Sequence, residues 1–279
     1  MATPAEIHPT ATVDLRARLG PGVRVGAYSV IGGEVVIEAD AEIGHHAVLE
    51  GAVTVGARAR IGHGSVLGGL PQDLKFKAGT RSGVRIGADT TIREYVTIHR
   101  ATQAGGWTEI GEGCLLMAMS HVAHDCRLGQ GVIVINYAGL TGHVQVGDRA
   151  TIGGLTGVAP FRRIGRLAYI GGCSKITSDI PPYFLADGAP ATARGVNVIG
   201  LRRGGMPAAD RRLIQEAYRL LYRSGLAPAR AVEAIRATLP ETPALTHLVE
   251  FIDASRCGIC APARRRSGAP EPGAGEPVF

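Results

Sequence analysis

The segment covering residues 120–126 carries the side chains best suited to catalysis. It reads Ser-His-Val-Ala-His-Asp-Cys and places His124 directly before Asp125. A histidine held by a carboxylate can act as a general base near neutral pH. A second segment, Gly142-His143, offers a glycine whose backbone N–H can stabilise an oxyanion. These residue types predict acyl transfer to a hydroxyl group.

A six-residue repeat indicates how these segments come together. An aliphatic residue recurs at every sixth position in two long runs, and this period matches neither an α-helix nor a single alternating strand. It predicts a short strand followed by a corner, with three such units in a coil of about 18 residues. The aliphatic positions are Ile7, Val13, Leu19, Val25, Ile31, Ile37, Ile43, Leu49, Val55, Ile61 and Leu67, then Ile110, Leu116, Val122, Leu128, Val134, Leu140, Val146, Ile152, Val158, Ile164, Ile170 and Ile176.

Residues one coil apart stack on one another in such a fold. Gly142 is therefore predicted to lie beside His124, and His143 beside Asp125. These contacts would gather a base, a carboxylate, a second histidine and a bare amide in one patch.

A second predicted column contains Asn136, Gly154 and Gly172. Its glycines would leave a groove beside the general base, wide enough for an extended acyl chain. The alternative is that these glycines allow close contact between subunits.

The details of the repeat point to a known architecture. Glycine often follows the aliphatic residue, as at Gly44, and a small residue comes four positions after it, as at Ala47. This pattern resembles the hexapeptide-repeat parallel β-helix, a mainly β fold, and the resemblance implies left-handed coiling. The repeat breaks at residues 68–83 and 100–107, which are predicted to be loops on the functional face.

Different periodicities divide the rest of the chain. We expect the prism to span residues 1–185, followed by a connecting segment and a helical domain over 186–258. A helix is predicted at 207–223, and Pro228 and Pro243 suit the first turns of two more. These helices would cap the open end of the prism. Residues 259–279 are rich in Pro, Gly and Ala, which predicts a disordered tail.

Composition excludes several classes of protein. No apolar stretch approaches the ~20 residues that span a bilayer, and no secretory signal precedes the repeats, so a cytoplasmic protein without stable membrane insertion is expected. The net charge of +6 comes without any nucleic-acid-binding motif and fits an acidic protein or a nucleotide-sugar phosphate better. Cys257 and Cys260 form a lone C-x-x-C, too few ligands for a structural zinc site.

The combined motifs resemble the acyl-carrier-protein-dependent UDP-N-acetylglucosamine O-acyltransferases, which start lipid A synthesis. The similar stretches lie within roughly residues 1–225 and include both loops and the first predicted helix. They are Gln72-Asp73-Leu74-Lys75, Ile92-Arg93-Glu94, Val96-Thr97-Ile98-His99-Arg100, His121-Val122-Ala123-His124-Asp125-Cys126, Gly142-His143-Val144, Gly171-Gly172-Cys173-Ser174, Asp179-Ile180-Pro181-Pro182-Tyr183, Gly195-Val196-Asn197 and Gly200-Leu201-Arg202-Arg203.

The resemblance implies a homotrimer with active sites between neighbouring prisms, no metal and no cofactor. His124 would take the proton of the glucosamine 3-hydroxyl as that group attacks a 3-hydroxyacyl thioester of acyl carrier protein. Asp125 would support His124, and the Gly142 N–H would hold the oxyanion. Gln72, Asp73 and Lys75 of the adjacent subunit would bind the sugar and the acyl chain. Substrate-binding roles are also expected for His99, His121, His143, Asn136, Gly154 and Gly172, and Gly172 would be the acyl ruler that sets the length of the acyl chain. Asn197 and Arg203 would bind the uridine diphosphate.

Some positions depart from the family pattern. Ala159 and Pro160 replace a His-Gln pair, and Pro190, Ile199 and Gly204 replace a histidine, a glutamate and an arginine. These departures concern nucleotide contacts and acyl length, and they leave open an acceptor sugar with a 3-amino group.

Two alternatives differ in class. A carbonic-anhydrase-like enzyme of the same fold would bind zinc through His121, His124 and His143, and a non-catalytic trimeric scaffold would not need His124.

Overall fold

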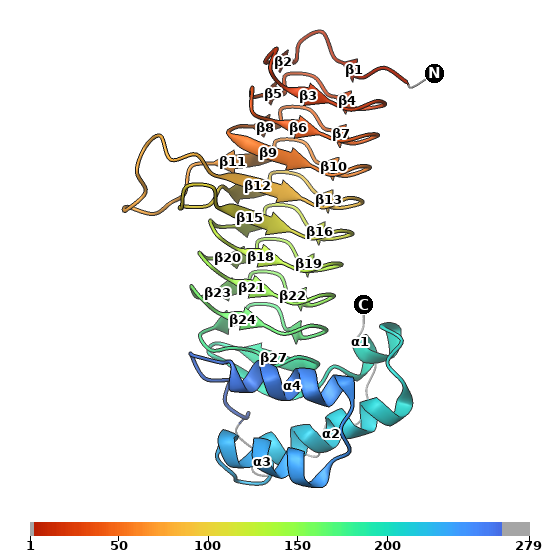
Figure 1. Cartoon of the computed structure of the whole chain (residues 1–279), viewed down its shortest axis with the longest axis vertical. Coiled ribbons are helices and arrows are strands. Elements are labelled where there is room, and N and C mark those ends of the chain that lie inside the picture. Colours follow the sequence, from red (N-terminus) through yellow and green to blue (C-terminus); the bar gives the residue numbers. More distant parts are fainter. Residues whose placement is uncertain (1–2, 264–279) are drawn as a thin grey trace.

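The chain coils into a three-sided prism, in which each coil adds one short strand to each face (Figure 1). The repeating aliphatic residues form its inner wall. This computed structural model describes residues 3–263. The strands of each face pair in parallel with the coils before and after them, up to the antiparallel hairpin that ends the first face. We name the faces A, B and C.

Face A has eleven strands. They are β1 (Glu6–Ile7), β4 (Arg24–Val25), β7 (Glu42–Ile43), β10 (Arg60–Ile61), β13 (Thr91–Ile92), β16 (Leu115–Leu116), β19 (Ile133–Val134), β22 (Thr151–Ile152), β25 (Tyr169–Ile170), β27 (Phe184–Gly188) and β28 (Ala191–Val196).

Faces B and C have nine and eight strands. Face B contains β2 (Thr12–Val13), β5 (Val30–Ile31), β8 (Val48–Leu49), β11 (Val66–Gly69), β14 (Thr97–His99), β17 (His121–Val122), β20 (Gly139–Leu140), β23 (Gly157–Val158) and β26 (Lys175–Ile176). Face C contains β3 (Arg18–Leu19), β6 (Val36–Ile37), β9 (Ala52–Val55), β12 (Gly83–Ile86), β15 (Trp107–Ile110), β18 (Arg127–Leu128), β21 (Gln145–Val146) and β24 (Arg163–Ile164).

The aliphatic residue of each unit points into the prism and the residue before it points out. In β17, for example, Val122 is fully buried while His121 is half-buried at the surface. Stacked Ile, Val and Leu side chains therefore supply a continuous core that excludes water along the axis. The first coil is the exception, because no coil precedes it: Ile7 is 45% exposed, and Val13 and Leu19 are only partly buried.

Both interruptions of the repeat occur at one corner, between faces B and C. The first separates β11 from β12 and covers residues 70–82, and the second separates β14 from β15 and covers residues 100–106. The first loop projects well away from the prism (Figure 1). The two loops are joined at their bases, because the Gly105 N–H donates to the Arg81 carbonyl at 2.8 Å.

The end of the prism is closed by a hairpin and then by helices. β27 pairs in parallel with β25 and antiparallel with β28. α2 (Ala208–Tyr222) packs on this hairpin through the Tyr218 hydroxyl, which donates to the Ala193 carbonyl at 3.2 Å. α3 (Pro228–Thr238) and α4 (Pro243–Asp253) begin at the two prolines expected to start helices. A short helix, α1 (Val198–Arg203), was not anticipated.

The C-terminal segment is more ordered at its start than its composition suggested. Cys260 is buried, the Cys260 N–H donates to the Asp179 carbonyl at 2.9 Å, and the Ala193 N–H donates to the Ala261 carbonyl at 2.8 Å. The expected disordered tail therefore does not begin at residue 259, because residues 259–263 pair with the end of the prism. The remainder of that predicted tail, 264–279, lies outside the described residues. Within residues 3–263, no helix combines the length and the apolar character required to cross a bilayer.

Candidate active site

His124 and Asp125 form a hydrogen-bonded pair at the corner between faces B and C. The corner follows β17, and the His124 Nδ1 lies 2.8 Å from the Asp125 Oδ2. Both side chains are only 13–14% exposed. Asp125 has a left-handed backbone conformation, with φ of 59°, which its short polar side chain tolerates. With Nδ1–H donating to the carboxylate, Nε2 is the free nitrogen of the ring.

The next coil brings Gly142 and His143 to this pair, as the repeat predicts. A Cβ at Gly142 would overlap the Cε1 and Nε2 edge of the His124 ring. The His143 Nε2 lies 3.7 Å from the Asp125 Oδ2, and the His143 N–H donates to the His124 carbonyl at 3.1 Å. Within the described residues the Gly142 N–H has no acceptor. Both predicted contacts are confirmed.

Two threonines, Thr102 of the second loop and Thr108 of β15, hold Asp125 in place. The Thr102 hydroxyl donates to the Asp125 Oδ2 at 2.8 Å, and the Thr102 N–H lies 3.2 Å from both carboxylate oxygens. The Thr108 hydroxyl accepts the Asp125 N–H at 2.9 Å. Burial acts to raise the pKa of Asp125, but hydrogen bonds from His124 and Thr102 outweigh it and lower that pKa. Asp125 is therefore a carboxylate at neutral pH.

His121 and His99 lie beside the pair on face B. Their rings meet edge to face at 4.7 Å, and the His121 Nδ1 is 2.7 Å from the Thr97 hydroxyl oxygen. Burial, with the nearby His121 and His124, lowers the pKa of His99 to about 4, and burial and His124 also lower the pKa of His121. Both rings are neutral at pH 7.

The column of Asn136, Gly154 and Gly172 stacks as predicted, but at another corner. The Leu155 N–H donates to the Asn136 carbonyl, and the Cys173 N–H to the Gly154 carbonyl. These residues follow strands of face A, so they lie between faces A and B. The expectation that the column lies directly beside His124 is wrong for a single chain, because face B separates the two corners.

The remaining predicted site residues lie apart from the pair within one chain. Gln72 and Lys75 are exposed on the first loop, where the Asp73 carboxylate accepts the Lys75 N–H at 2.9 Å. Arg203 is exposed in α1. Asn197 caps α1: its Oδ1 accepts the Gly200 N–H at 3.0 Å, and its Nδ2 donates to the Leu167 carbonyl at 2.9 Å. Both ends of this amide therefore already have protein partners.

Some departures from the family pattern have local explanations. Gly204 ends α1, and a side chain there would press on the Leu167 side chain and the Gly200 carbonyl. A side chain at residue 204 would therefore require the Leu167 side chain or the Gly200 carbonyl to shift by a few tenths of an ångström. Nothing in the structure explains Ile199.

The set of potential metal ligands at the site differs from the expected one. His124, Asp125 and His143 each place a donor atom within 4.8 Å of the others, whereas His121, which the zinc alternative required, is not part of this group. In this arrangement the His124 Nδ1 and the Asp125 Oδ2 are bonded to each other. That mutual bond suits an acid–base pair.

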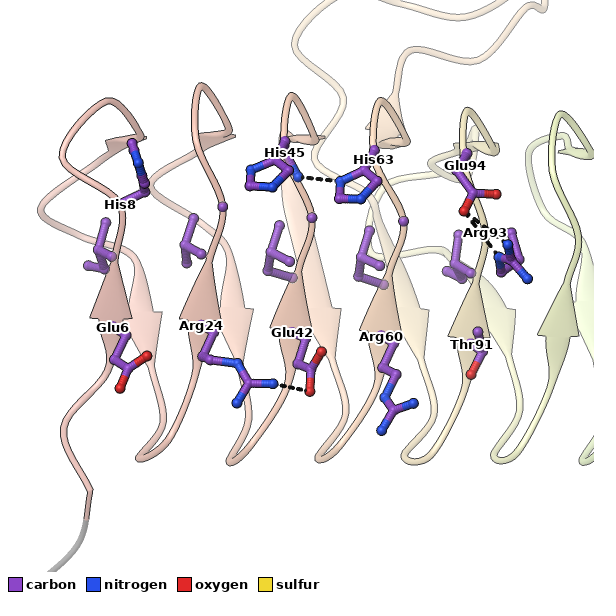
Figure 2. Close-up of a pocket in the computed structure, with 18 residues that line it drawn as sticks. Glu6, His8, Arg24, Glu42, His45, Arg60, His63, Thr91, Arg93 and Glu94 are labelled. Carbon is purple, nitrogen blue, oxygen red and sulfur yellow. Dashed lines mark hydrogen bonds and ion pairs between the residues drawn. The ribbon is translucent and has the colours of Figure 1, made fainter.

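A shallow groove elsewhere, along the first strands of face A, has a different character (Figure 2). Its outward residues alternate in charge, from Glu6 through Arg24 and Glu42 to Arg60. The stacked rings of His45 and His63 are fixed by the backbone, since the Nδ1 of each accepts an N–H. Neighbouring groups thus satisfy one another here, which favours a solvated surface over a reaction site.

Sequence reasoning missed three residues around Asp125. Phe161 stacks on His143 with ring centroids 4.5 Å apart, and one more step of the repeat from His143 would have found it. Thr108 lies in β15, one coil of 18 residues before Cys126, so the repeat would also have placed it next to Asp125. Thr102 carried no such signal, because it lies in a loop that obeys no repeat.

Comparison with known protein families places this geometry in context. Residues 16–51 and 34–69 match the family model described as bacterial transferase hexapeptide (six repeats). Residues 179–260 match the second domain of UDP-N-acetylglucosamine O-acyltransferase.

Solved structures of similar proteins share the fold. A UDP-N-acetylglucosamine acyltransferase from Bacteroides fragilis has a TM-score of 0.88 and 37% identity, with 90% of this chain and 98% of that chain covered. A structure from Acinetobacter baumannii has a TM-score of 0.87 and 37% identity, with 91% and 99% covered. This likeness confirms the predicted left-handed parallel β-helix with a small C-terminal helical domain.

Sequence relatives extend the likeness. The acyl-[acyl-carrier-protein]–UDP-N-acetylglucosamine O-acyltransferase of Thermodesulfovibrio yellowstonii is 43% identical over 256 residues, covering 91% of this chain and 99% of the relative. The enzyme of the same name from Alkalilimnicola ehrlichii is 47% identical over 254 residues, covering 91% and 98%. With such identity over nearly the whole length of its relatives, the chain belongs to the acyl-[acyl-carrier-protein]–UDP-N-acetylglucosamine O-acyltransferase family.

Proposed function

We propose that this protein transfers a 3-hydroxyacyl chain from acyl carrier protein to the 3-hydroxyl of UDP-N-acetylglucosamine, the first step of lipid A synthesis in the cytoplasm. The observation that carries the proposal is the contact of Gly142 with the His124 ring, beside the His124–Asp125 hydrogen bond. It joins a base, its orienting carboxylate and an amide donor, which acyl transfer needs together.

The chemistry follows from the orientation of the imidazole. Because Nδ1–H is held by Asp125, Nε2 accepts the proton of the sugar hydroxyl as its oxygen attacks the thioester carbonyl carbon. The carbonyl oxygen gains the negative charge, and the Gly142 N–H stabilises it. The carbon–sulfur bond then breaks, and the departing thiolate takes the proton from Nε2. The products are the O-acyl sugar and the free thiol of acyl carrier protein.

Neutral histidines beside the pair suit a polar, uncharged sugar. The neutral rings of His121 and His99 lie beside the base, and a neutral ring can both donate and accept a hydrogen bond; the His143 ring lies against His124 from the next coil. We assign these side chains to the glucosamine and its acyl groups, and Asn197 and Arg203 to the uridine diphosphate. Since the Asn197 side chain already caps α1, its contribution would be to fix α1 beside the nucleotide.

A homotrimer with sites between subunits would unite the dispersed residues. Successive coils expose apolar or aromatic side chains at the corner between faces A and B, including Tyr137 at 57% and Leu155 at 63%. A continuous exposed apolar column is typical of a protein contact surface. We propose that a second copy covers it, so that Asn136, Gly154 and Gly172 line an acyl groove opposite the neighbour's His124.

The same assembly would give the first loop its role. In a trimer, Gln72, Asp73 and Lys75 would reach the sugar and acyl chain held by the adjacent subunit. The exposure of Gln72 and Lys75 on a projecting loop supports this arrangement. Sedimentation of the full chain should give three times 29.0 kDa, and Leu155→Asp should lower that mass.

The decisive experiment uses the purified full chain with 3-hydroxyacyl carrier proteins of several lengths. UDP-N-acetylglucosamine and its 3-amino analogue are offered as acceptors, with His124→Ala in parallel and His8→Ala, an exposed histidine of the face A groove, as the control. We expect transfer to the hydroxyl sugar, its loss in His124→Ala and no change in His8→Ala. Full activity of His124→Ala would refute the general base, and transfer only to the amino sugar would overturn the assigned acceptor.

A further inference from the structure

Thr102 is the residue through which the second loop contacts the reacting pair. Its hydroxyl donates to the Asp125 Oδ2 at 2.8 Å, and its N–H bridges both carboxylate oxygens at 3.2 Å. The same Oδ2 accepts from the His124 Nδ1 at 2.8 Å. One carboxylate oxygen thus connects the loop to the base.

The loop itself is anchored where it meets the prism. The Ala101 carbonyl, just before Thr102, accepts the Ser82 hydroxyl, and the Gly83 N–H donates to the Gly106 carbonyl at 3.0 Å. Ser82 is buried. Thr102 therefore donates from a backbone that is fixed at both ends of the loop.

We infer that Thr102 is a positioning residue that orients the His124–Asp125 pair for catalysis. This inference rests on the proposed role of His124 as general base. In residues 3–263 the side-chain and N–H hydrogen bonds of Thr102 all go to Asp125 and none goes to His124, so Thr102 acts by fixing the rotation of the Asp125 carboxylate. A carboxylate rotated away would release Nδ1–H, and the base nitrogen Nε2 would lose its alignment.

The Thr102 hydroxyl also affects how strongly the negative charge of the Asp125 carboxylate acts on the His124 ring. Each donor to an ionised oxygen takes up part of its negative charge. Without the Thr102 hydroxyl, more of that charge faces the imidazole and stabilises its protonated form. The acid limb of the kcat profile should then move to higher pH.

The test compares Thr102→Val with Thr102→Ser in the full chain. Valine keeps the shape and the backbone N–H but removes the hydroxyl, whereas serine retains it. Thr238→Val is the matched control, because it removes a hydroxyl that donates only to the Ala234 carbonyl in α3. Steady-state kinetics across pH and a thermal melt are measured for each variant.

We expect Thr102→Val to lower kcat about 10-fold to 100-fold, with KM changed less than about twofold. Its acid limb moves to higher pH, Thr102→Ser recovers most of the rate, and Thr238→Val behaves as the parent protein. A wild-type rate and pH profile in Thr102→Val overturns the inference. A lower rate with an unshifted profile, or one that serine does not rescue, also overturns it by showing a purely structural role.

His124→Ala, assayed alongside, separates this inference from the proposed function. If His124→Ala stays active, the general base is wrong. If His124→Ala is inactive while Thr102→Val is fully active, only the positioning role fails.

Discussion

Gly142 lies against the imidazole of His124, one coil further along the prism, where any Cβ would overlap the Nε2 edge of the ring. The absence of a side chain at residue 142 is thus what allows the base and the predicted oxyanion donor to be neighbours.

Gly142→Ala should reduce kcat about 100-fold, because a displacement of about 1 Å of a catalytic group can have an effect of this size. Gly195→Ala is the control, since a Cβ there meets no atom within 4 Å. Kinetics and thermal melting of both variants check the prediction. A Gly142→Ala enzyme with full activity would show that the ring can move without loss.

Asp125→Asn should lower kcat by at least about 100-fold while the protein stays folded. The amide preserves the shape of the side chain, but it removes the charge and can donate where the carboxylate accepts, which disfavours the reactive tautomer of His124. Asp89→Asn, which only weakens an exposed ion pair with Arg58, should leave kcat unchanged. Equal rates for the two variants would contradict the assigned role of Asp125.

His99 should make folding stability sensitive to acid. Its pKa is about 4 in the folded protein, below the ordinary value of 6.5, so the unfolded chain binds more protons between these values. Its contribution to the free energy of unfolding is complete above pH 6.5 and is lost as the pH falls toward 4. Melting temperatures of His99→Phe should fall less over this window than those of the parent protein. An unchanged slope would argue against a neutral, half-buried His99 ring in the folded protein.

Chelation of metals should leave the transfer rate unchanged. The proposed steps use His124, Asp125 and the Gly142 N–H, and none requires a Lewis acid. Dialysis against EDTA followed by assay provides the measurement, with zinc added back in a second sample. Loss of activity that zinc restores would instead make His124, Asp125 and His143 metal ligands.

The repeat predicted local neighbours well and the shape of the site less well. Counting 18 residues along the six-residue repeat correctly predicts that Gly142 lies beside His124 and His143 beside Asp125, because consecutive coils between β17 and β24 have equal length. Counting fails across the loops, where Thr97 pairs with His121 at a separation of 24 residues.

The six-residue repeat also does not predict which corner of the prism a column of stacked residues occupies. Asn136 and Gly142 are close in sequence but lie on opposite edges of face B, so the predicted groove was assigned to the wrong corner of the single chain. The contact of Thr102 with Asp125 could not be predicted from the repeat, because it depends on the path of a loop that lies outside the repeat.

The two loops follow the fourth and fifth strands of face B, β11 and β14, and this has a consequence for how the protein can vary. The coils containing β1 to β8 contribute nothing to the spacing between the loops and His124. A whole coil could be added to or removed from that end, and the rod would change in length while the geometry of the reacting corner remained the same. Evolution or design can therefore change the number of coils before the loops, whereas the distance from the second loop to His124 must be kept.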